Sequence, residues 1–353
     1  MNYNVFADFH HAGLLNSLII LFEDRLGGNL YRPIGKEWNY RGLWKIAEHP
    51  ATVEQYLGIG GATPDETPKL NEAQQSINGV FLCQDIDSGK TNKAITMLRF
   101  FALDIDFVIA SVPQHIHPYF KLCQEHPNKP KLIYQIGNAW NIPQDEEKYI
   151  DGVMASTILG RKPTVPYIEY HQEFDLDTFG YKKPKDFKKI TSFVNCFNTA
   201  SIFMFDWKLF ERIERLMPGW EFKALGGSCR DGCAHGSGKV AEAMQKSRFI
   251  WHTKAGGDGY GHVIHNTGAV GRPAIVRKMY YHGKLAEKLM IDGKTCIAID
   301  GLTDEEIVNK IEHYNEPKRY EKMCKVVYDN FKNVVDFDAE AKEIKKFLGE
   351  VKK

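Results

Sequence analysis

Residues 254–273 read KAGGDGYGHVIHNTGAVGRP, and this stretch carries the most information about the fold. Four glycines fall within six residues, between an apolar run at 248–253 and a helix-like pattern at 262–270. Glycines let backbone N–H groups approach a ligand closely, and a helix N-terminus adds partial positive charge. The pattern therefore predicts a phosphate or diphosphate site, although a tight strand-to-helix turn would look the same.

The residues around this stretch alternate between strand and helix patterns. We expect strands near 190–197, 220–227, 248–253 and 271–278, and helices near 206–218, 240–247 and 262–270. Three amphipathic helices are expected at 303–314, 319–333 and 338–351. Alternation of this kind is typical of a parallel sheet with helices on both faces.

The N-terminal half repeats the pattern. A strand at 2–9, a helix at 14–28 that ends in two glycines, and a strand at 29–35 form the first unit of a doubly wound sheet. Further strands are expected at 79–84, 106–112, 131–138 and 165–171. Residues 172–189 are charged and lack apolar periodicity, so they are predicted to link two α/β domains, 1–171 and 190–353. The last helix could pack back on the N-terminal domain.

Composition excludes several classes of protein. Of the 353 residues 43% are hydrophobic and 26% charged, as in ordinary globular proteins. No apolar run is long enough for a membrane helix, the N-terminus lacks a signal-peptide pattern, and seven scattered cysteines suit reduced thiols, so we expect a cytoplasmic protein with no membrane partner. The net charge of +1 argues against a protein that wraps duplex DNA. Cys229, Cys233 and His235 lack a second pair of zinc ligands, so no metal site is expected.

The Gly-rich stretch resembles the nucleotide-sugar motif of GT-B glycosyltransferases. Many of these have an acid, Gly, an aromatic residue and Gly, then a second acid eight positions after the first, then Gly-x-Pro. Here Asp258 begins the motif, Asn266 stands at the second acid, and residues 271–273 read GRP. The resemblance implies a GT-B fold, two Rossmann-like domains facing a cleft, with a UDP-sugar as donor and no bound metal. It implies donor contacts from Lys254, Gly257, Asp258, Gly259, Tyr260, Gly261, His262, His265 and Asn266.

Two departures from the family pattern affect the donor site. Asn266 keeps hydrogen-bonding capacity but loses the charge of the acid that binds ribose in much of the family. The loop after the first strand of this domain, 195–201, holds no basic residue to clamp the diphosphate. Lys254, Arg230 and His262 are the available substitutes.

A second cluster follows the first strand of the chain. Asp8, His10 and His11 would lie at its carboxyl end, the edge that faces the ligand crevice in open parallel sheets. In inverting glycosyltransferases a carboxylate or histidine near this cleft deprotonates the acceptor, and a histidine pKa near 6.5 suits that role. The sequence does not separate His10 from His11, and a turn cluster is the alternative.

The acceptor is suggested by a second resemblance. Residues 9–35, FHHAGLLNSLIILFEDRLGGNLYRPIG, are similar to glycosyltransferase-like proteins of tailed phages. That resemblance implies hydroxymethylated pyrimidine in phage DNA as acceptor, inside the host cytoplasm. Five lysines within 182–189 could contact DNA phosphates or form a solvated linker. A glycan acceptor, a sugar-nucleotide epimerase and a binding module without catalysis stay open. The pairs Asp85/Asp87, Asp104/Asp106 and Asp175/Asp177 are read as solvated acids rather than metal ligands.

Overall fold

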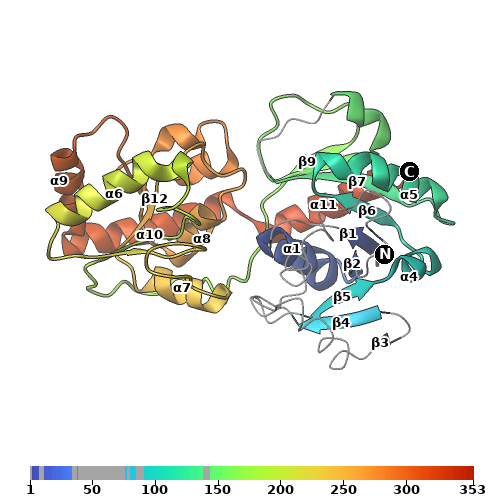
Figure 1. Ribbon diagram of the computed structural model, residues 1–353, viewed down its shortest axis with the longest axis horizontal. Helices are drawn as coiled ribbons and strands as arrows, with labels where there is room; N and C mark the ends of the chain where they lie inside the picture. Colours follow the sequence, from blue (N-terminus) through green and yellow to red (C-terminus); the bar gives the residue numbers. More distant parts are fainter. Residues whose placement is uncertain are drawn as a thin grey trace. The chain divides into compact units, whose positions relative to one another are not determined.

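The chain forms two compact units (Figure 1). The computed structural model describes residues 2–7, 12–33, 38, 76–77, 80–84, 91–137 and 144–353. Unit 1 comprises Met1–Phe174 together with Phe337–Lys353, and unit 2 comprises Asp175–Asp336. The chain thus passes from unit 1 into unit 2 and returns to unit 1 at its C-terminal end.

Unit 1 is built on one large sheet. Its strands are β1 (Asn4–Ala7), β2 (Asn29–Pro33), β3 (Ser76–Ile77), β4 (Val80–Gln84), β5 (Thr91–Ile95), β6 (Phe107–Ala110), β7 (Lys131–Ile136), β8 (Gly152–Ala155) and β9 (Tyr167–Glu169). They lie in the order β3-β4-β5-β2-β1-β6-β7-β8-β9, parallel except for the antiparallel edge β3-β4-β5. The chain order reverses between β1 and β6, which is the topological switch point of this sheet.

Helices of unit 1 cover two apolar clusters. They are α1 (Ala12–Ile19), which continues as a π-helix (Ile20–Arg25), α4 (Met97–Ala102), α5 (Ile116–Glu125) and α11 (Phe337–Val351). Leu14, Leu18 and Phe22 share one core cluster with Ile344 and Leu348 of α11. The C-terminal helix therefore completes the core of unit 1, on the face that α1 covers.

Ion pairs hold α11 to unit 1. The guanidinium of Arg25 lies 2.6 Å from Glu173 and 2.5 Å from Asp338, the second residue of α11. Nδ1 of His171 lies 2.6 Å from the carboxylate of Glu340. These pairs join the end of the first helix and the end of β9 to the first turn of α11.

Unit 2 has a smaller sheet that is entirely parallel. Its strands are β10 (Lys189–Ser192), β11 (Glu221–Ala224), β12 (Phe249–His252), β13 (Ala274–Val276) and β14 (Cys296–Ala298). The order β11-β10-β12-β13-β14 places the switch point between β10 and β12. The carboxyl ends of these two strands therefore border the expected ligand site.

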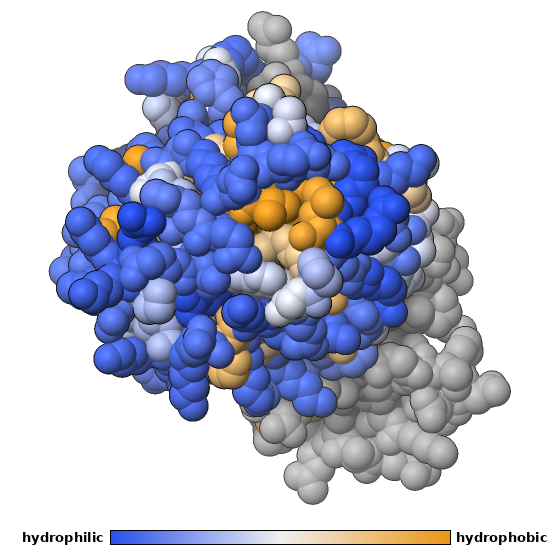
Figure 2. All heavy atoms as spheres, turned by 90° about the vertical axis from the view of Figure 1, so that its left-hand side faces the viewer, coloured by the Kyte–Doolittle hydropathy of each residue, from blue (hydrophilic) through white to orange (hydrophobic). Residues whose placement is uncertain are grey.

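Five helices surround the sheet of unit 2. They are α6 (Met204–Leu216), α7 (Ser237–Gln245), α8 (His262–Val270), α9 (Asp304–Asn315) and α10 (Pro317–Val334). Helix α6 packs against α9, and α8 packs against α7 and α10. Figure 2 views the molecule from the left-hand side of Figure 1, where α6 and α9 lie. That face is mainly hydrophilic with one apolar area near its centre, so the helices turn most of their apolar side chains inward.

The predicted fold class, two doubly wound parallel-sheet domains, is confirmed. The strands that the local patterns missed include β3, β5 and β8. In β5, TNKAI, only the last two residues are apolar, and β8, GVMA, is four residues long, so neither has a clear strand pattern. The strand expected at 190–197 ends at Ser192, because the chain turns at 195–199. Among the described residues, every helix is too short or too polar to cross a lipid bilayer.

The segment 182–189 runs along the amino ends of the unit 2 strands. Arg272, just before β13, donates from Nη1 to the carbonyl of Lys182 at 3.0 Å. The amide of Glu221, which opens β11, donates to the carbonyl of Lys188 at 2.8 Å. The lysine-rich segment therefore lies at the sheet edge opposite to the one that carries the Gly-rich loop.

Candidate donor-binding site

The Gly-rich loop, residues 253–261, leaves the carboxyl end of β12 and opens α8. Because β12 borders the switch point of the unit 2 sheet, the loop lies where ligands bind in open α/β folds. Helix α8 begins at His262, so its N-terminal amides and partial positive charge lie at the same edge. The loop therefore combines two features of phosphate sites: a position at the switch point and the N-terminus of a helix.

The side chain of Asp258 contacts three residues in and around this loop. Its Oδ2 lies 2.7 Å from Nε2 of His252, the last residue of β12, and accepts a 3.4 Å hydrogen bond from the hydroxyl of Tyr281. Its Oδ1 pairs with Nζ of Lys254. One carboxylate thus joins the strand, the loop and the segment that follows β13.

The charge of Asp258 is stabilised by its partners. Burial alone would raise the pKa of this carboxyl, but the hydrogen bond from His252 and the positive charge of Lys254 hold the pKa well below its usual range. His252 is 1% exposed, and its Nδ1 has no hydrogen-bond partner among the described residues. Both carboxylate oxygens of Asp258 are therefore occupied by protein donors, and these bonds fix the conformation of the loop.

The loop is tied to the segment after β13 by main-chain contacts. A Cβ atom at Gly257 would lie 2.1 Å from the carbonyl oxygen of Tyr280, so only glycine fits. Nζ of Lys284 donates to the carbonyl of Gly256 at 2.7 Å. Burial lowers the pKa of Lys284, and the anion of Asp258 acts in the opposite direction. Lys254 and Lys284 thus bring two ammonium groups to the loop.

His265 and His262, both predicted to contact the UDP-sugar, differ in solvent exposure. His265 is fully buried, stacks on Tyr260 with ring centroids 4.1 Å apart, and lies with Nδ1 2.9 Å from the carbonyl of Gly261. His262 is partly exposed in the first turn of α8 and contacts the edge of Tyr260 at 4.8 Å. In this arrangement His265 and Tyr260 shape the loop from within, and His262 is the histidine at its surface.

Asn266 follows one turn later on α8. Its side-chain carbonyl oxygen is buried without a hydrogen-bond partner among the described residues. An unpaired buried carbonyl is uncommon and is satisfied by a ligand or water donor. Asn266 thus carries a side-chain acceptor that no described residue uses. The predicted roles of Gly259, Asn266 and the other loop residues stay predictions.

Arg230 lies on the loop after β11 and is engaged with protein groups. It donates to both carboxylate oxygens of Glu214, to Asp231 and to the carbonyl of Phe222, and its guanidinium lies over the ring of Trp207. A diphosphate would have to compete with two carboxylates for this group. Among the predicted cations, Lys254 is the one inside the Gly-rich loop.

The N-terminal candidates Asp8, His10 and His11 lie outside the described residues, as do Asp85 and Asp87. The other acid pairs have structural partners: Asp106 accepts from the amide of Asn4, and Asp175 from the amide of Asp177. Within the part of the chain that the structure describes, no cluster of three or more His, Cys, Asp or Glu side chains could hold a metal ion.

Three residues around the loop were not predicted from the sequence: His252, Tyr281 and Lys284. The only local signal is His252, a polar side chain that ends the apolar strand FIWH. Tyr281 and Lys284 lie more than 20 residues beyond Asp258 in sequence and reach the loop because β13 pairs with β12, which residue spacing does not reveal.

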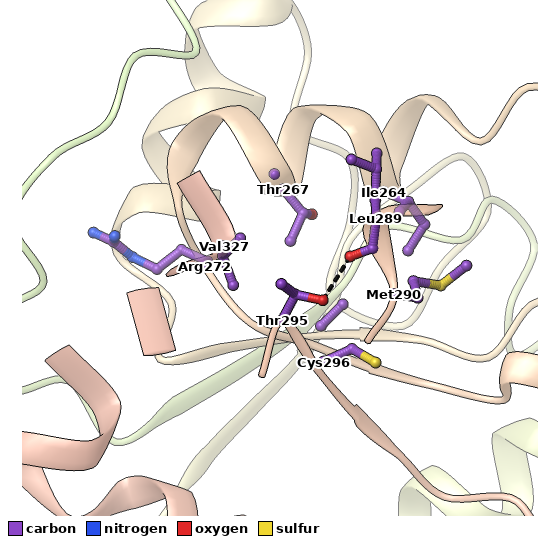
Figure 3. A pocket seen from close by; sticks show the side chains of 10 residues that line it. Ile264, Thr267, Arg272, Leu289, Met290, Thr295, Cys296 and Val327 are labelled. Carbon is purple, nitrogen blue, oxygen red and sulfur yellow. Dashed lines mark hydrogen bonds between the residues drawn. The ribbon is translucent and has the colours of Figure 1, made fainter. Parts of the chain in front are cut away.

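A small cavity lies behind α8, away from the loop (Figure 3). Its volume is about 10 Å³, room for at most one water molecule. It is lined by side chains of α8, α10 and the turn before β14, where the hydroxyl of Thr295 donates to the carbonyl of Leu289 at 2.7 Å. Its size excludes a nucleotide, so this cavity is a packing gap.

Comparison with known proteins gives structural likeness only. No protein-family model matches the chain, and a search of curated protein sequences finds no match. An alpha-glucosyltransferase solved with UDP-glucose and DNA containing an abasic site shares 10% identity, with a TM-score of 0.61 over 98% of this chain and 99% of that one. Anabaena Alr3699/HepE, solved with UDP and glucose, shares 12% identity, with a TM-score of 0.60 over 99% and 100%.

A third solved structure agrees with these two. The pneumococcal O-GlcNAc transferase GtfA, in complex with UDP and GlcNAc, shares 11% identity, with a TM-score of 0.56 over 99% of both chains. All three likenesses extend over nearly the whole of both chains, so they concern the complete two-unit arrangement of elements along the sequence. This chain has the GT-B fold of these glycosyltransferases.

Proposed function

We propose that this protein is a glycosyltransferase that transfers a sugar from a UDP-sugar to a hydroxymethylated pyrimidine in DNA. The observation that carries the proposal is the Gly-rich loop at the switch point of unit 2, which opens α8 and has Lys254 and Lys284 beside it. The solved structures of like fold were obtained with UDP, glucose or UDP-glucose, which supports a UDP-sugar as donor.

The chemistry that this loop suits is departure of a nucleoside diphosphate. The acceptor oxygen attacks the anomeric carbon of the sugar, the bond from that carbon to the phosphate oxygen breaks, and UDP leaves with one more negative charge. Loop amides, the N-terminus of α8 and the ammonium groups of Lys254 and Lys284 would stabilise that charge. No step in this scheme requires a metal ion.

The acceptor proton needs a base if the reaction inverts the anomeric centre. We assign this role to the cluster of Asp8, His10 and His11, because it follows β1, which borders the switch point of the unit 1 sheet. The base takes the hydroxyl proton as the carbon–oxygen bond forms. A retaining reaction would need no such base.

DNA is the favoured acceptor for two reasons. Residues 9–35 resemble phage glycosyltransferase-like proteins, and a structure of like fold was solved with UDP-glucose and DNA. A base inside a duplex cannot reach an enclosed site, so the target nucleotide would have to leave the stack. A glycan acceptor is the alternative, since GtfA is an O-GlcNAc transferase of like fold.

The test is direct transfer. The protein is incubated with UDP-glucose, or another UDP-sugar, and DNA that contains hydroxymethylcytosine or hydroxymethyluracil. Digestion to nucleosides and mass spectrometry should then show a hexose added to the modified nucleoside, with unmodified DNA as control. Transfer to a glycan but to no DNA would exclude DNA as acceptor, and an isomerised UDP-sugar without transfer would identify an epimerase.

Variants assign the base. Alanine at the residue that acts as base should lower the transfer rate by about 10²–10⁴-fold while leaving the UDP affinity unchanged. Single alanine variants of Asp8, His10 and His11 therefore form one series, with the UDP affinity measured by calorimetry as control. Full rates in all three would remove the cluster from the mechanism.

A further inference from the structure

Three large apolar side chains are unusually exposed at the edge of unit 2 that carries the Gly-rich loop. Ile202 is 65% exposed, Phe205 70% and Met279 69%, the highest values for large apolar side chains in this unit. Ile202 and Phe205 lie three residues apart at the start of α6, after β10, and Met279 follows β13. We call Ile202, Phe205, Met279, Arg277 and Lys278 the edge surface.

Contacts join the start of α6 to the segment after β13. The guanidinium carbon of Arg277 lies 5.2 Å from the ring centre of Phe205, and Nε of Arg277 donates to Asp206 at 2.6 Å. The hydroxyl of Tyr280 donates to the other oxygen of Asp206 at 2.8 Å. The start of α6 and the segment after β13 are thereby held together by a buried carboxylate, since Asp206 is fully buried.

The edge surface also adjoins the donor-binding loop. The carbonyl of Tyr280 is the group that contacts Gly257, and the neighbouring Tyr281 contacts Asp258. The side chain of Tyr280 thus contacts Asp206, beneath the edge surface, while its main chain contacts the donor loop. The edge surface and the donor loop are thus linked through Tyr280 and Tyr281.

The charge around the edge surface suits a polyanion. The segments 193–208 and 277–284 contain one acid, Asp206, against four lysines and arginines: Lys208, Arg277, Lys278 and Lys284. A second carboxylate, that of Asp300, accepts hydrogen bonds from the amides of Lys278 and Met279. Asp206 and Arg277 form an ion pair, which leaves Lys208, Lys278 and Lys284 against Asp300. Within the described residues, nothing accepts a hydrogen bond from the two terminal nitrogens of Arg277 or from Nζ of Lys278.

We propose that the edge surface is the DNA-contacting surface of unit 2, an inference that rests on DNA being the acceptor. Phe205, Met279 and Ile202 stack on or wedge beside the bases next to the target nucleotide, and Lys278 contacts a flanking phosphate. Arg277, whose side chain is only 13% exposed, supports the ring of Phe205. Apolar wedges beside cations are a recurrent way to open a base stack. The lysine-rich segment 182–189 does not serve this purpose, because it lies at the opposite edge of the sheet.

The experiment compares Phe205→Ala and the double variant Phe205→Ala/Met279→Ala with a matched control, Leu216→Ala. Leu216 is an exposed apolar residue at the other end of α6, 47% exposed. Transfer is measured on a duplex with one hydroxymethylated base and on the free hydroxymethyl nucleoside. Loss of one stacking contact should lower kcat/KM on DNA by roughly 5- to 100-fold. Transfer to the free nucleoside, slow UDP-sugar hydrolysis and UDP affinity should not change.

Three outcomes overturn the inference. Wild-type transfer to DNA by the double variant would exclude the edge surface as a DNA contact. An equal loss on the nucleoside and on DNA would place these side chains in the donor site instead. Rescue of DNA transfer by Phe205→Trp but not by Phe205→Leu supports stacking, and the reverse contradicts it. If the wild-type protein modifies no DNA at all, the proposed acceptor fails first, which distinguishes the two failures.

Discussion

Gly257→Ala tests the contact between the donor loop and the segment after β13. At Gly257 φ is +67°, and a Cβ atom would lie 2.1 Å from the carbonyl oxygen of Tyr280. The preceding Gly256 has a similar φ of +76°, but a Cβ atom there would meet nothing within 4 Å. The two positions form a matched pair, because alanine is strained by its backbone at both and by a clash at only one.

The expected magnitudes follow from this difference. Alanine in the left-handed region costs about 1–2 kcal/mol at either position. Forcing an extra carbon against a fixed carbonyl adds about 1–3 kcal/mol at Gly257. For a unit of this size the added destabilisation corresponds to a melting temperature about 2–12 °C lower for Gly257→Ala than for Gly256→Ala.

Thermal unfolding by circular dichroism measures the difference, and titration with UDP measures its effect on the site. Gly257→Ala should weaken UDP binding more than Gly256→Ala, because the clash moves the loop that we assign to the diphosphate. Coincident melting curves for the two variants would refute the contact between Gly257 and Tyr280. A lower melting temperature for Gly257→Ala with unchanged UDP affinity would keep the contact but remove the loop from the donor site.

Three further predictions concern charge and metal. Because its pKa is lower in the folded state, the Asp258 carboxylate stabilises the fold at pH values above its unfolded pKa of about 4, and this stabilisation is lost as the pH falls below that value. Asp258→Asn should therefore lower the unfolding free energy by about 2 kcal/mol at pH 7. In urea titrations the variant should also show a smaller decrease of unfolding free energy below about pH 4 than the wild type. Asp206→Ala leaves the guanidinium of Arg277 buried without its partner and should cost about 3 kcal/mol in the same assay, whereas Asp206→Asn, which keeps an acceptor, should cost less. Transfer activity should persist in EDTA, and complete loss restored by Mn²⁺ would assign a metal to one of the Asp-x-Asp pairs.

The local sequence predicts the parts of this fold that local patterns can encode. Apolar runs such as FIWH, followed by glycines and a helix pattern, place β12, the Gly-rich loop and α8 in the right order. Strand β5 has no such run, since three of its five residues are polar, and it exists because its neighbours β2 and β4 pair with it. Strand formation there is a property of the sheet rather than of the segment.

In the candidate site, too, some features follow from local sequence and others depend on contacts between distant segments. Glycine spacing predicts the loop, because the loop is contiguous in sequence. The ammonium group of Lys284 is not predictable in this way: it follows a different strand and reaches Gly256 only because β12 and β13 pair. Arg230 shows the opposite case: the sequence predicts it as a cation for the diphosphate, but it forms an ion pair with Glu214, a residue of the preceding helix. Long-range pairing decides which charges are available, and residue spacing does not report it.

The return of the chain to unit 1 has a consequence for synthesis. Unit 2 is a continuous segment, Asp175–Asp336, so all of its residues have been made before the ribosome reaches α11. Unit 1, whose first residues are translated first, needs Ile344, Leu348 and Val351 to close its core. The part of unit 1 that precedes unit 2 therefore cannot complete its core during translation of unit 2, because the core cluster containing Leu14 and Phe22 lacks its α11 side chains until that helix is translated.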